Sequence, residues 1–392
     1  MHISFIISPV VIALLATGFV ALAAVVWWHW TRALRLRRFA SRYEHEREYA
    51  TQLPPVSVVV SAHNDADCLQ RFLPSLLEQD YPADFEVVVV DDGSCDTSAD
   101  ALSALVAQYG NLRVTFIPDD TRALSRKKLS IMVGIKAAKH DIVLTTCANC
   151  RPDSPQWLRL MMRNFTPDTD VVLGFSHIEA GADRGIGRRY RAFDAASCGC
   201  QWLSAAVKGN PYRGDGNNLA YRKRCFFERN GFASSLDLRW GEDDVFVSEI
   251  ATGANTRVEI DPDAMVTVEH DDAVLAHRRL KLRRDFTARR LPRLPFAVQG
   301  LMSVLAYAGV ACTAAAVALD WANVVTDAVA AVVVLAAAVA VMPAVGRCCR
   351  LLGLRRLRLT APVMVLWRPL VDIAYMLRAT RDHDSNYTSI ID

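Results

Sequence analysis

The first 30 residues lack charge: no Asp, Glu, Lys or Arg occurs between residues 2 and 30. An uncharged apolar run of this length can cross a bilayer as one helix. It lacks the basic start of a signal peptide and exceeds the apolar core of one, so we expect a membrane anchor rather than a cleaved leader. Tryptophans at its end and the arginines that follow indicate a membrane interface with the next domain in the cytoplasm. These residues are Trp27, Trp28, Trp30, Arg32, Arg35, Arg37 and Arg38.

The chain also lacks a regular cysteine spacing and a strong net charge. Its ten cysteines are scattered, which is typical of reduced intracellular thiols rather than of a disulfide scaffold. Its 45 basic and 42 acidic residues leave a net charge of +3, which gives no reason to expect nucleic acid as a partner. A length of 392 residues suggests two or three structural units.

Two further uncharged runs lie near the C-terminus, at residues 296–319 and 328–346. The turn between them contains aspartates but no Lys or Arg, whereas residues 347–358 contain five arginines. This asymmetry again places the central domain on the cytoplasmic side. We therefore expect a multi-pass protein of the cell inner (cytoplasmic) membrane.

The last apolar stretch, residues 361–378, is interrupted by Arg368 and Asp372. A fourth membrane span would have to bury both charges, so we favour a helix lying in the interface, with a buried ion-paired span as the alternative. The expected units are an anchor and basic linker at residues 1–50, a cytoplasmic domain at 51–290, and a membrane region with tail at 291–392.

The central domain alternates apolar runs of strand length with segments of helical periodicity. The expected strands are 56–62, 85–92, 112–117 and 141–146, and the expected helices are 67–78, 98–110 and 126–140. Uninterrupted Val/Ile/Leu strands that alternate with helices indicate an α/β fold with a mostly parallel sheet covered on both faces. Ligands bind such sheets at the carboxyl ends of the strands.

Polar residues follow three of these expected strands. They form the groups 63–65, 91–94 and 147–149, which we expect to converge on one edge of the sheet as a ligand site. A polar loop tip or a helix cap would explain any single group without a ligand.

Several stretches of the chain resemble a known family. The stretches "VSVVVSAHNDADCLQRFLPSLL" and "FEVVVVDDGSCDTS" resemble the start of a family-2 glycosyltransferase of the GT-A fold, which is Rossmann-like. The resemblance continues through "SRKKLSIMVGIKAAKHDIVLTT", "PQWLRLM", "GDGNNLAYRK" and "GEDDVFV", and covers residues 54–290. It implies an inverting enzyme that moves a sugar from a nucleotide-sugar donor, expected to be a UDP-sugar, to a lipid-linked or membrane-proximal glycan. The alternative is a catalytically silent sugar-nucleotide-binding or scaffold protein in envelope glycan assembly.

The resemblance also implies roles for polar residues at the nucleotide side. His63, Asn64, Asp65 and Asp92 match positions that hold the nucleotide. A carboxylate suits this role because uracil N3–H and ribose hydroxyls are donors. The pair 127–128, Lys127 with Lys128, matches a basic position near the diphosphate, where an ammonium offsets phosphate charge.

The motif "GEDDVF" matches the acidic segment from which the family draws its general base. Asp243 is the candidate base, with Glu242 and Asp244 beside it. Adjacent carboxylates repel one another, which raises the proton affinity of at least one of them. Asn217 and Asn218 match the acceptor side, although a turn made by Asp-Gly-Asn explains the same residues.

One acceptor motif of the family is incomplete. Its Gln-x-x-Arg-Trp motif corresponds here to "LKLRRDF", in which Arg283 can fill the Arg position but the Gln and the Trp are missing. This departure, together with only three expected membrane helices, argues against a processive polymer synthase.

The metal motif of the family is also missing. Where the family has Asp-x-Asp to bind Mg²⁺ or Mn²⁺, this chain has Cys147-Ala148-Asn149. Three explanations stay open: a weak metal site that uses Asn149, a metal-independent enzyme in which Lys127 and Arg283 neutralise the diphosphate, or an inactive protein. We favour the second. We do not expect Cys147 and Cys150 to form a zinc half-site or a redox pair, because no second ligand pair or suitable helix context accompanies them.

Overall fold

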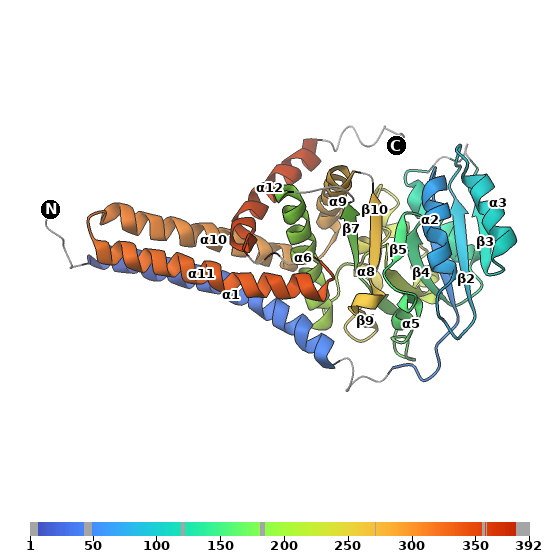
Figure 1. Ribbon diagram of the computed structural model, residues 1–392, viewed down its shortest axis with the longest axis horizontal. Helices are drawn as coiled ribbons and strands as arrows, with labels where there is room; N and C mark the ends of the chain where they lie inside the picture. The colour runs from blue at the N-terminus through green and yellow to red at the C-terminus, as the bar shows by residue number, and fades with distance from the viewer. Residues whose placement is uncertain are drawn as a thin grey trace.

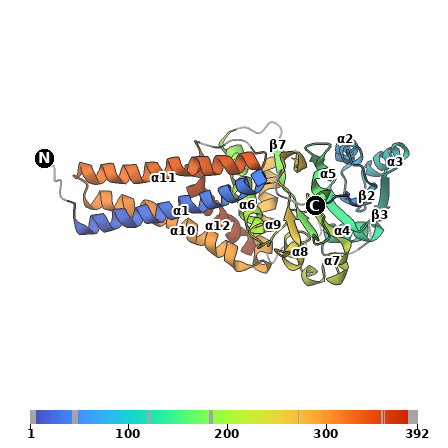
Figure 2. The same cartoon turned by 90° about the horizontal axis from the view of Figure 1, so that it is seen from below.

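An arm of three long apolar helices and an α/β domain at one end of it make up the structure, a computed structural model (Figure 1). It describes residues 7–42, 49–118, 121, 123–180, 185–270, 272–354, 357 and 359–381. The view from below shows the same division, with the arm extending away from the sheets (Figure 2).

The larger sheet has seven strands in the order β3-β2-β1-β4-β8-β6-β9. They are β1 (Val56–Ala62), β2 (Phe85–Asp91), β3 (Leu112–Phe116), β4 (Ile142–Cys147), β6 (Val171–Leu173), β8 (Leu219–Arg222) and β9 (Thr256–Val258). The first four strands are parallel, and β8 pairs antiparallel with both β4 and β6. The prediction of a mostly parallel α/β sheet is therefore confirmed, and all four expected strands are present.

Helices α2 (Ala66–Leu77), α3 (Ser98–Gln108) and α4 (Arg126–Ala137) connect the parallel strands. Helix α2 buries an apolar face that includes Leu69, Phe72 and Leu76, as its spacing predicts. Helix α4 lies close against β1, since a Cβ added at Gly134 would collide with Val59. The close packing on β1 positions the N-terminus of α4 near the carboxyl edge of the sheet.

A second, three-stranded sheet has the order β5-β10-β7. Its strands are β5 (Cys150–Pro152), β7 (Ser176–Ala180) and β10 (Val266–His270), and the remaining helices of the domain are α5 (Trp157–Met162), α6 (Ile186–Val207), α7 (Lys223–Glu228), α8 (Asp244–Ile250) and α9 (Ala273–Thr287). Short 3₁₀ turns lie at residues 233–235, 262–264 and 288–290. Because β5 follows β4 after a two-residue turn, this sheet lies directly beside the polar edge of the larger one.

The arm consists of α1 (Pro9–Arg42), α10 (Arg293–Leu319) and α11 (Val324–Leu351). Within the described ranges these are the three helices that are long and apolar enough to cross a membrane. Helices α1 and α10 approach closely at two glycines, since a Cβ at Gly18 would lie 2.7 Å from Thr313 Cγ2 and one at Gly309 would lie 2.7 Å from Leu22 Cγ. Small residues at such a crossing are typical of packed membrane helices.

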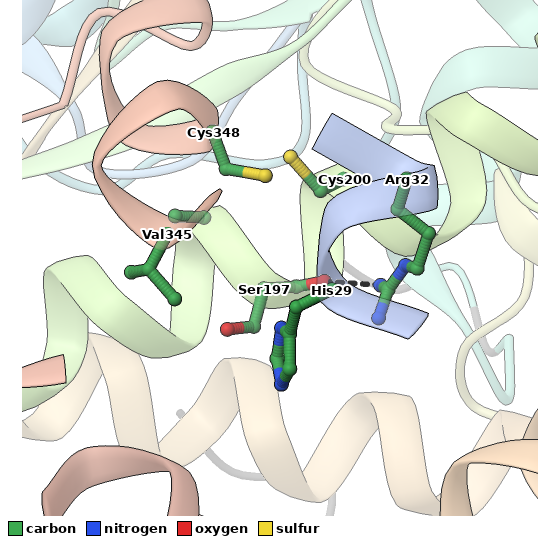
Figure 3. Close-up of a pocket in the computed structure, with 7 residues that line it drawn as sticks. His29, Arg32, Ser197, Cys200, Val345 and Cys348 are labelled. Atoms are coloured by element: carbon green, nitrogen blue, oxygen red, sulfur yellow. Dashed lines mark hydrogen bonds between the residues drawn. The ribbon is translucent and has the colours of Figure 1, made fainter. Parts of the chain in front are cut away.

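The arm joins the domain where α6 packs against α1 and α11. A pocket at this junction is lined by side chains of all three helices, among them His29, Arg32, Cys200 and Cys348 (Figure 3). Arg32 Nη2 donates to Ser197 O at 2.8 Å, which connects the anchor helix to the domain.

Helix α12 (Ala361–Arg381) lies beside α9, α10 and α11 and is not one of the three apolar candidates (Figure 1). The two charged residues that interrupt its apolar sequence face the domain: Arg368 Nε lies 2.8 Å from Asp194 Oδ1, and Asp372 pairs with Lys281. Large apolar side chains on α12 are exposed at helical spacing, namely Val363, Trp367, Leu370, Ile373, Met376 and Leu377. Such an amphipathic helix suits a membrane surface, and the interfacial location remains a prediction.

Candidate active site

The loops after β1 and β2 interlock at the carboxyl edge of the sheet. His63 Nδ1 donates to Asp92 O at 2.7 Å, and the Cys95 amide donates to Asn64 Oδ1 at 2.9 Å. The Asn64 amide in turn donates to Ser94 Oγ at 2.9 Å. Asn64 adopts a left-handed backbone conformation with φ 53°, which Asn tolerates better than most residues. The expected convergence of these two polar groups is therefore observed.

Asp92 and Asp65 have different surroundings at this edge. Asp92 is buried and paired with Arg126, whose Nε lies 3.0 Å from Asp92 Oδ1 and whose Nη2 lies 3.1 Å from Asp92 O. Asp65 accepts the His63 amide at 3.0 Å, and burial raises the pKa of Asp65. Sequence reasoning did not identify Arg126, although it stands directly before the predicted lysine pair.

The two lysines of α4 point to different places. Lys127 Nζ lies 3.2 Å from Cys147 Sγ at the end of β4 and 3.9 Å from Glu242 Oε1. Lys128 is buried, and its ammonium donates to the carbonyl oxygens of Ser235 and Leu238, the latter at 2.8 Å. Lys127 therefore belongs to the site, whereas Lys128 holds a neighbouring loop and no longer counts among the candidate diphosphate contacts.

Cys147 brings the third polar group to the same edge. Its Sγ lies 3.3 Å from Asn217 Oδ1 and 3.8 Å from Ser61 Oγ on the adjacent strand β1. A hydrogen bond from Cys150 and the nearby Lys127 ammonium lower the pKa of Cys147 to about 5, despite its burial. Burial by itself lowers the pKa of Lys127, but Cys147 and the carboxylates of Glu242 and Asp243 raise it above its usual value.

The acidic motif lies across from Lys127 and is bound by Arg283 of α9. Arg283 Nη2 lies 3.0 Å from Glu242 Oε1 and also pairs with Asp243 Oδ2. Asp243 accepts two backbone amides, from Gly216 at 3.1 Å and from Asp244 at 2.6 Å. Burial acts to raise the pKa of Asp243, but Arg283 and these donors hold it well below its usual value. Asp243 is therefore ionised, as a proton acceptor must be.

Asp244 has the opposite electrostatic environment. Burial and the neighbouring Asp243 charge raise the pKa of Asp244 to about 6. Its Oδ2 accepts the Thr287 hydroxyl and lies 3.5 Å from Arg213 Nη2. The expected rise in proton affinity thus falls on Asp244 rather than on the candidate base. Sequence reasoning missed Arg213, whose position next to "GDGNN" was its only signal.

Asn217 and Asn218, which directly precede β8, also have side chains in different surroundings. Asn217 Nδ2 lies 3.4 Å from Ser176 Oγ, and its Oδ1 faces Cys147, so its side chain belongs to the site. Asn218 is fully buried and its side chain is bound by the Trp157 indole at 3.0 Å and the carbonyls of Phe175 and Ala264. Asn218 therefore organises the core beneath the turn, and we no longer count it as an acceptor contact.

Asn149, the residue that remains of the metal motif, is tied to β10. Its side-chain Nδ2 donates to the Glu269 backbone carbonyl at 3.0 Å, and its backbone carbonyl accepts the Glu269 amide at 2.9 Å. No group of three or more His, Cys, Asp or Glu residues in the described part of the chain is placed to hold a metal ion. One amide and one cysteine sulfur beside the Lys127 ammonium do not suit Mg²⁺ or Mn²⁺, which prefer several oxygen ligands.

The family model described as Glycosyl transferase family 2 matches residues 57–234. The succinoglycan biosynthesis protein ExoO of Rhizobium meliloti is 27% identical over 250 residues, which cover 59% of this chain and 69% of that protein. The undecaprenyl-phosphate 4-deoxy-4-formamido-L-arabinose transferase of Serratia proteamaculans is 31% identical over 123 residues, 30% of this chain and 35% of that protein.

Among solved structures, the chain is similar to the mannosyltransferase PcManGT from Pyrobaculum calidifontis, in complex with GDP-Man and Mn²⁺. The TM-score is 0.54 at 21% identity, and the match covers 93% of this chain and 98% of that one. This likeness shows a shared fold.

Proposed function

We propose that this protein, whose residues 57–234 match the Glycosyl transferase family 2 model, moves a sugar from a nucleotide-sugar to a lipid-linked or membrane-proximal glycan acceptor, with inversion. The strongest support for this proposal is the environment of Asp243. The buried Asp243 lies at the carboxyl edge of the sheet and pairs with Arg283, which also contacts Glu242, and Glu242 in turn lies 3.9 Å from Lys127.

The proposed reaction is a single in-line displacement. The carboxylate of Asp243 takes the proton of the acceptor hydroxyl as the hydroxyl oxygen attacks the anomeric carbon. The bond from that carbon to the diphosphate oxygen breaks, and the nucleoside diphosphate leaves with the electron pair. Attack from the face opposite the leaving group inverts the anomeric configuration. No step is assigned to Mg²⁺ or Mn²⁺, because the residues at the end of β4 do not fit them.

The expected donor is a UDP-sugar. Asp65 and Asp92 supply carboxylates at the edge where the base and ribose are expected, and His63 and Asn64 order the loops between them. The fold neighbour PcManGT was solved with GDP-Man, so GDP-sugars belong in the same screen.

The acceptor is proposed to approach from the membrane. The Serratia relative acts on undecaprenyl phosphate by its name, and the Rhizobium relative is named for succinoglycan biosynthesis. Three candidate spans joined to the domain suit an acceptor that is anchored in the inner membrane, with the domain on the cytoplasmic side. We propose addition of one or a few sugars rather than processive synthesis.

To test this proposal, the rate of sugar transfer is measured for the purified protein reconstituted in membranes, and wild type is compared with Asp243→Asn. Loss of the general base should lower the transfer rate by about 100-fold or more. Asp263→Asn is the matched control, because Asp263 is exposed in a turn away from the acidic motif.

Equal rates for wild type and Asp243→Asn would exclude Asp243 as the base. Donor binding without transfer or hydrolysis, in every combination of donor and acceptor extract, would favour the alternative of a silent sugar-nucleotide-binding protein. A screen of radiolabelled UDP- and GDP-sugars against membrane lipid extract identifies the donor in the same experiment.

A further inference from the structure

At the end of β4, where the metal motif is missing, the Lys127 ammonium lies 3.2 Å from Cys147 Sγ. We propose that the Lys127 ammonium, positioned by Cys147 and Glu242, binds the donor diphosphate in place of a divalent cation, together with Arg283. This inference rests on the proposed function and adds to it how the leaving charge is stabilised.

The position of Lys127 follows from the packing of α4. The helix begins at Arg126 after the N-cap Ser125, whose Oγ accepts the Lys128 amide at 3.2 Å. Its N-terminus carries partial positive charge and faces the carboxyl edge of the sheet, where a phosphate would bind. From this first turn the Lys127 side chain reaches Cys147 at the end of β4. About 32% of that side chain is exposed, so a ligand can reach the ammonium.

The Lys127 ammonium opposes a second cation at the end of β4 and offers a donor to an anion there. A divalent ion bound at Cys147 would lie next to the Lys127 ammonium, which is 3.2 Å from Cys147 Sγ, and the two like charges would repel. The Cys147 sulfur and the Asn149 amide offer too few oxygen ligands to offset this repulsion. A diphosphate at the same place would instead gain a charge-assisted hydrogen bond from the ammonium.

Arg283 completes the cationic site from the opposite side. Its guanidinium contacts both Glu242 and Asp243, so it joins the proposed base to the position of the leaving group. A planar guanidinium can donate to phosphate oxygens in pairs, whereas an ammonium acts as a point charge. When Arg283 turns toward the diphosphate, Asp243 loses an ion-pair partner, which increases its affinity for the acceptor proton.

The first experiment measures metal dependence in the wild type. Transfer, and binding of UDP and GDP by calorimetry, are compared in EDTA and in MnCl₂, and Mn²⁺ binding is followed by electron paramagnetic resonance. We expect transfer and nucleotide affinity to change little with EDTA, and no specifically bound Mn²⁺. Transfer or nucleotide binding that EDTA abolishes and Mn²⁺ restores would overturn the proposal.

The second experiment removes the ammonium. Lys127→Met is expected to weaken UDP or GDP binding and to lower kcat/KM by about 100-fold, without rescue by Mn²⁺. Lys136→Met, on an exposed turn of the same helix, is the matched control and should bind the nucleotides as wild type does. Unchanged nucleotide affinity in Lys127→Met, with a native circular dichroism spectrum, would contradict the proposal.

Cys147 is a positioning residue in this arrangement, so its variants should separate KM from kcat. Cys147→Asp keeps a partner for the ammonium and should retain the donor KM, whereas Cys147→Ala frees Lys127 and should raise it. Equal donor KM values in the two variants would remove Cys147 from the proposal. If no donor is turned over by the wild type, the proposed function fails, while UDP and GDP binding by the Lys127 variants still decides this inference.

Discussion

Asp243 and Asp244 are neighbours in the chain but have opposite electrostatic environments. Arg283 and two backbone amides surround Asp243, whereas Asp244 is buried beside the charge of Asp243. The sequence predicted that two adjacent carboxylates would differ in proton affinity. Asp244 holds its proton more tightly because burial and the Asp243 charge raise its pKa, whereas Arg283, 40 residues further along the chain, lowers the pKa of Asp243.

The raised pKa of Asp244 predicts a pH effect on stability. Because the native carboxyl titrates at about 6, above its unfolded value, its favourable contribution is present below the unfolded pKa and is lost as pH rises through about 6. Raising the pH from about 5 to about 7 should therefore lower the melting temperature of the wild type more than that of Asp244→Asn. The control is Asp263→Asn, which should follow the wild type.

Thermal unfolding of the detergent-solubilised protein at both pH values measures this difference. An identical pH shift in wild type and Asp244→Asn would show that Asp244 does not titrate in this range.

At the scale of elements, an ion network ties α12 to the domain. Asp194 of α6 contacts two cations, Lys281 at 3.1 Å and Arg368 at 2.8 Å, and the His277 imidazole at 3.1 Å. Asp372 of α12 pairs with Lys281. The charges that interrupt the last apolar stretch thus face the domain and leave the apolar side chains of α12 exposed. Charge on one face and apolar residues on the other are what an interfacial helix requires.

Removal of the central acid of this network is predicted to be costly. Asp194→Asn leaves the buried Lys281 and Arg368 with only the partly exposed Asp372 as an anion and should lower stability by about 3–5 kcal/mol. Asp237→Asn removes an exposed ion pair with Arg290 and should change stability by less than about 1 kcal/mol. Thermal unfolding of both variants in detergent measures the two losses of stability. Comparable losses would show that the Asp194 network has no special structural role.

At the scale of the whole molecule, the charge asymmetry of the apolar segments predicts the membrane orientation. The turn between α10 and α11 should lie outside the cytoplasm, whereas Cys95, exposed beside the nucleotide edge, should lie inside. A cysteine introduced at Trp321, which is 74% exposed in that turn, is expected to react with a membrane-impermeant maleimide in intact cells. Cys95 should react only after permeabilisation. Labelled peptides identified by mass spectrometry report both sites, and the reverse pattern would invert the orientation.

The sequence by itself determined the elements and the edge at which they meet. Strand-length apolar runs predicted β1, β2, β3 and β4 to within two residues, because parallel strands covered by helices are mostly apolar. The same rule placed the nucleotide side at the ends of these strands, and uninterrupted apolar length identified the three helices of the arm.

Only the tertiary structure decided which polar residue of each motif faces the site. Lys127 and Lys128 are adjacent, as are Asn217 and Asn218, yet one of each pair contacts Cys147 and the other is buried in the protein. Periodicity reports burial along one element, whereas these contacts join residues 20 to 110 positions apart. The Lys127 ammonium beside Cys147 is such a long-range contact, and it depends on how α4 packs against the sheet.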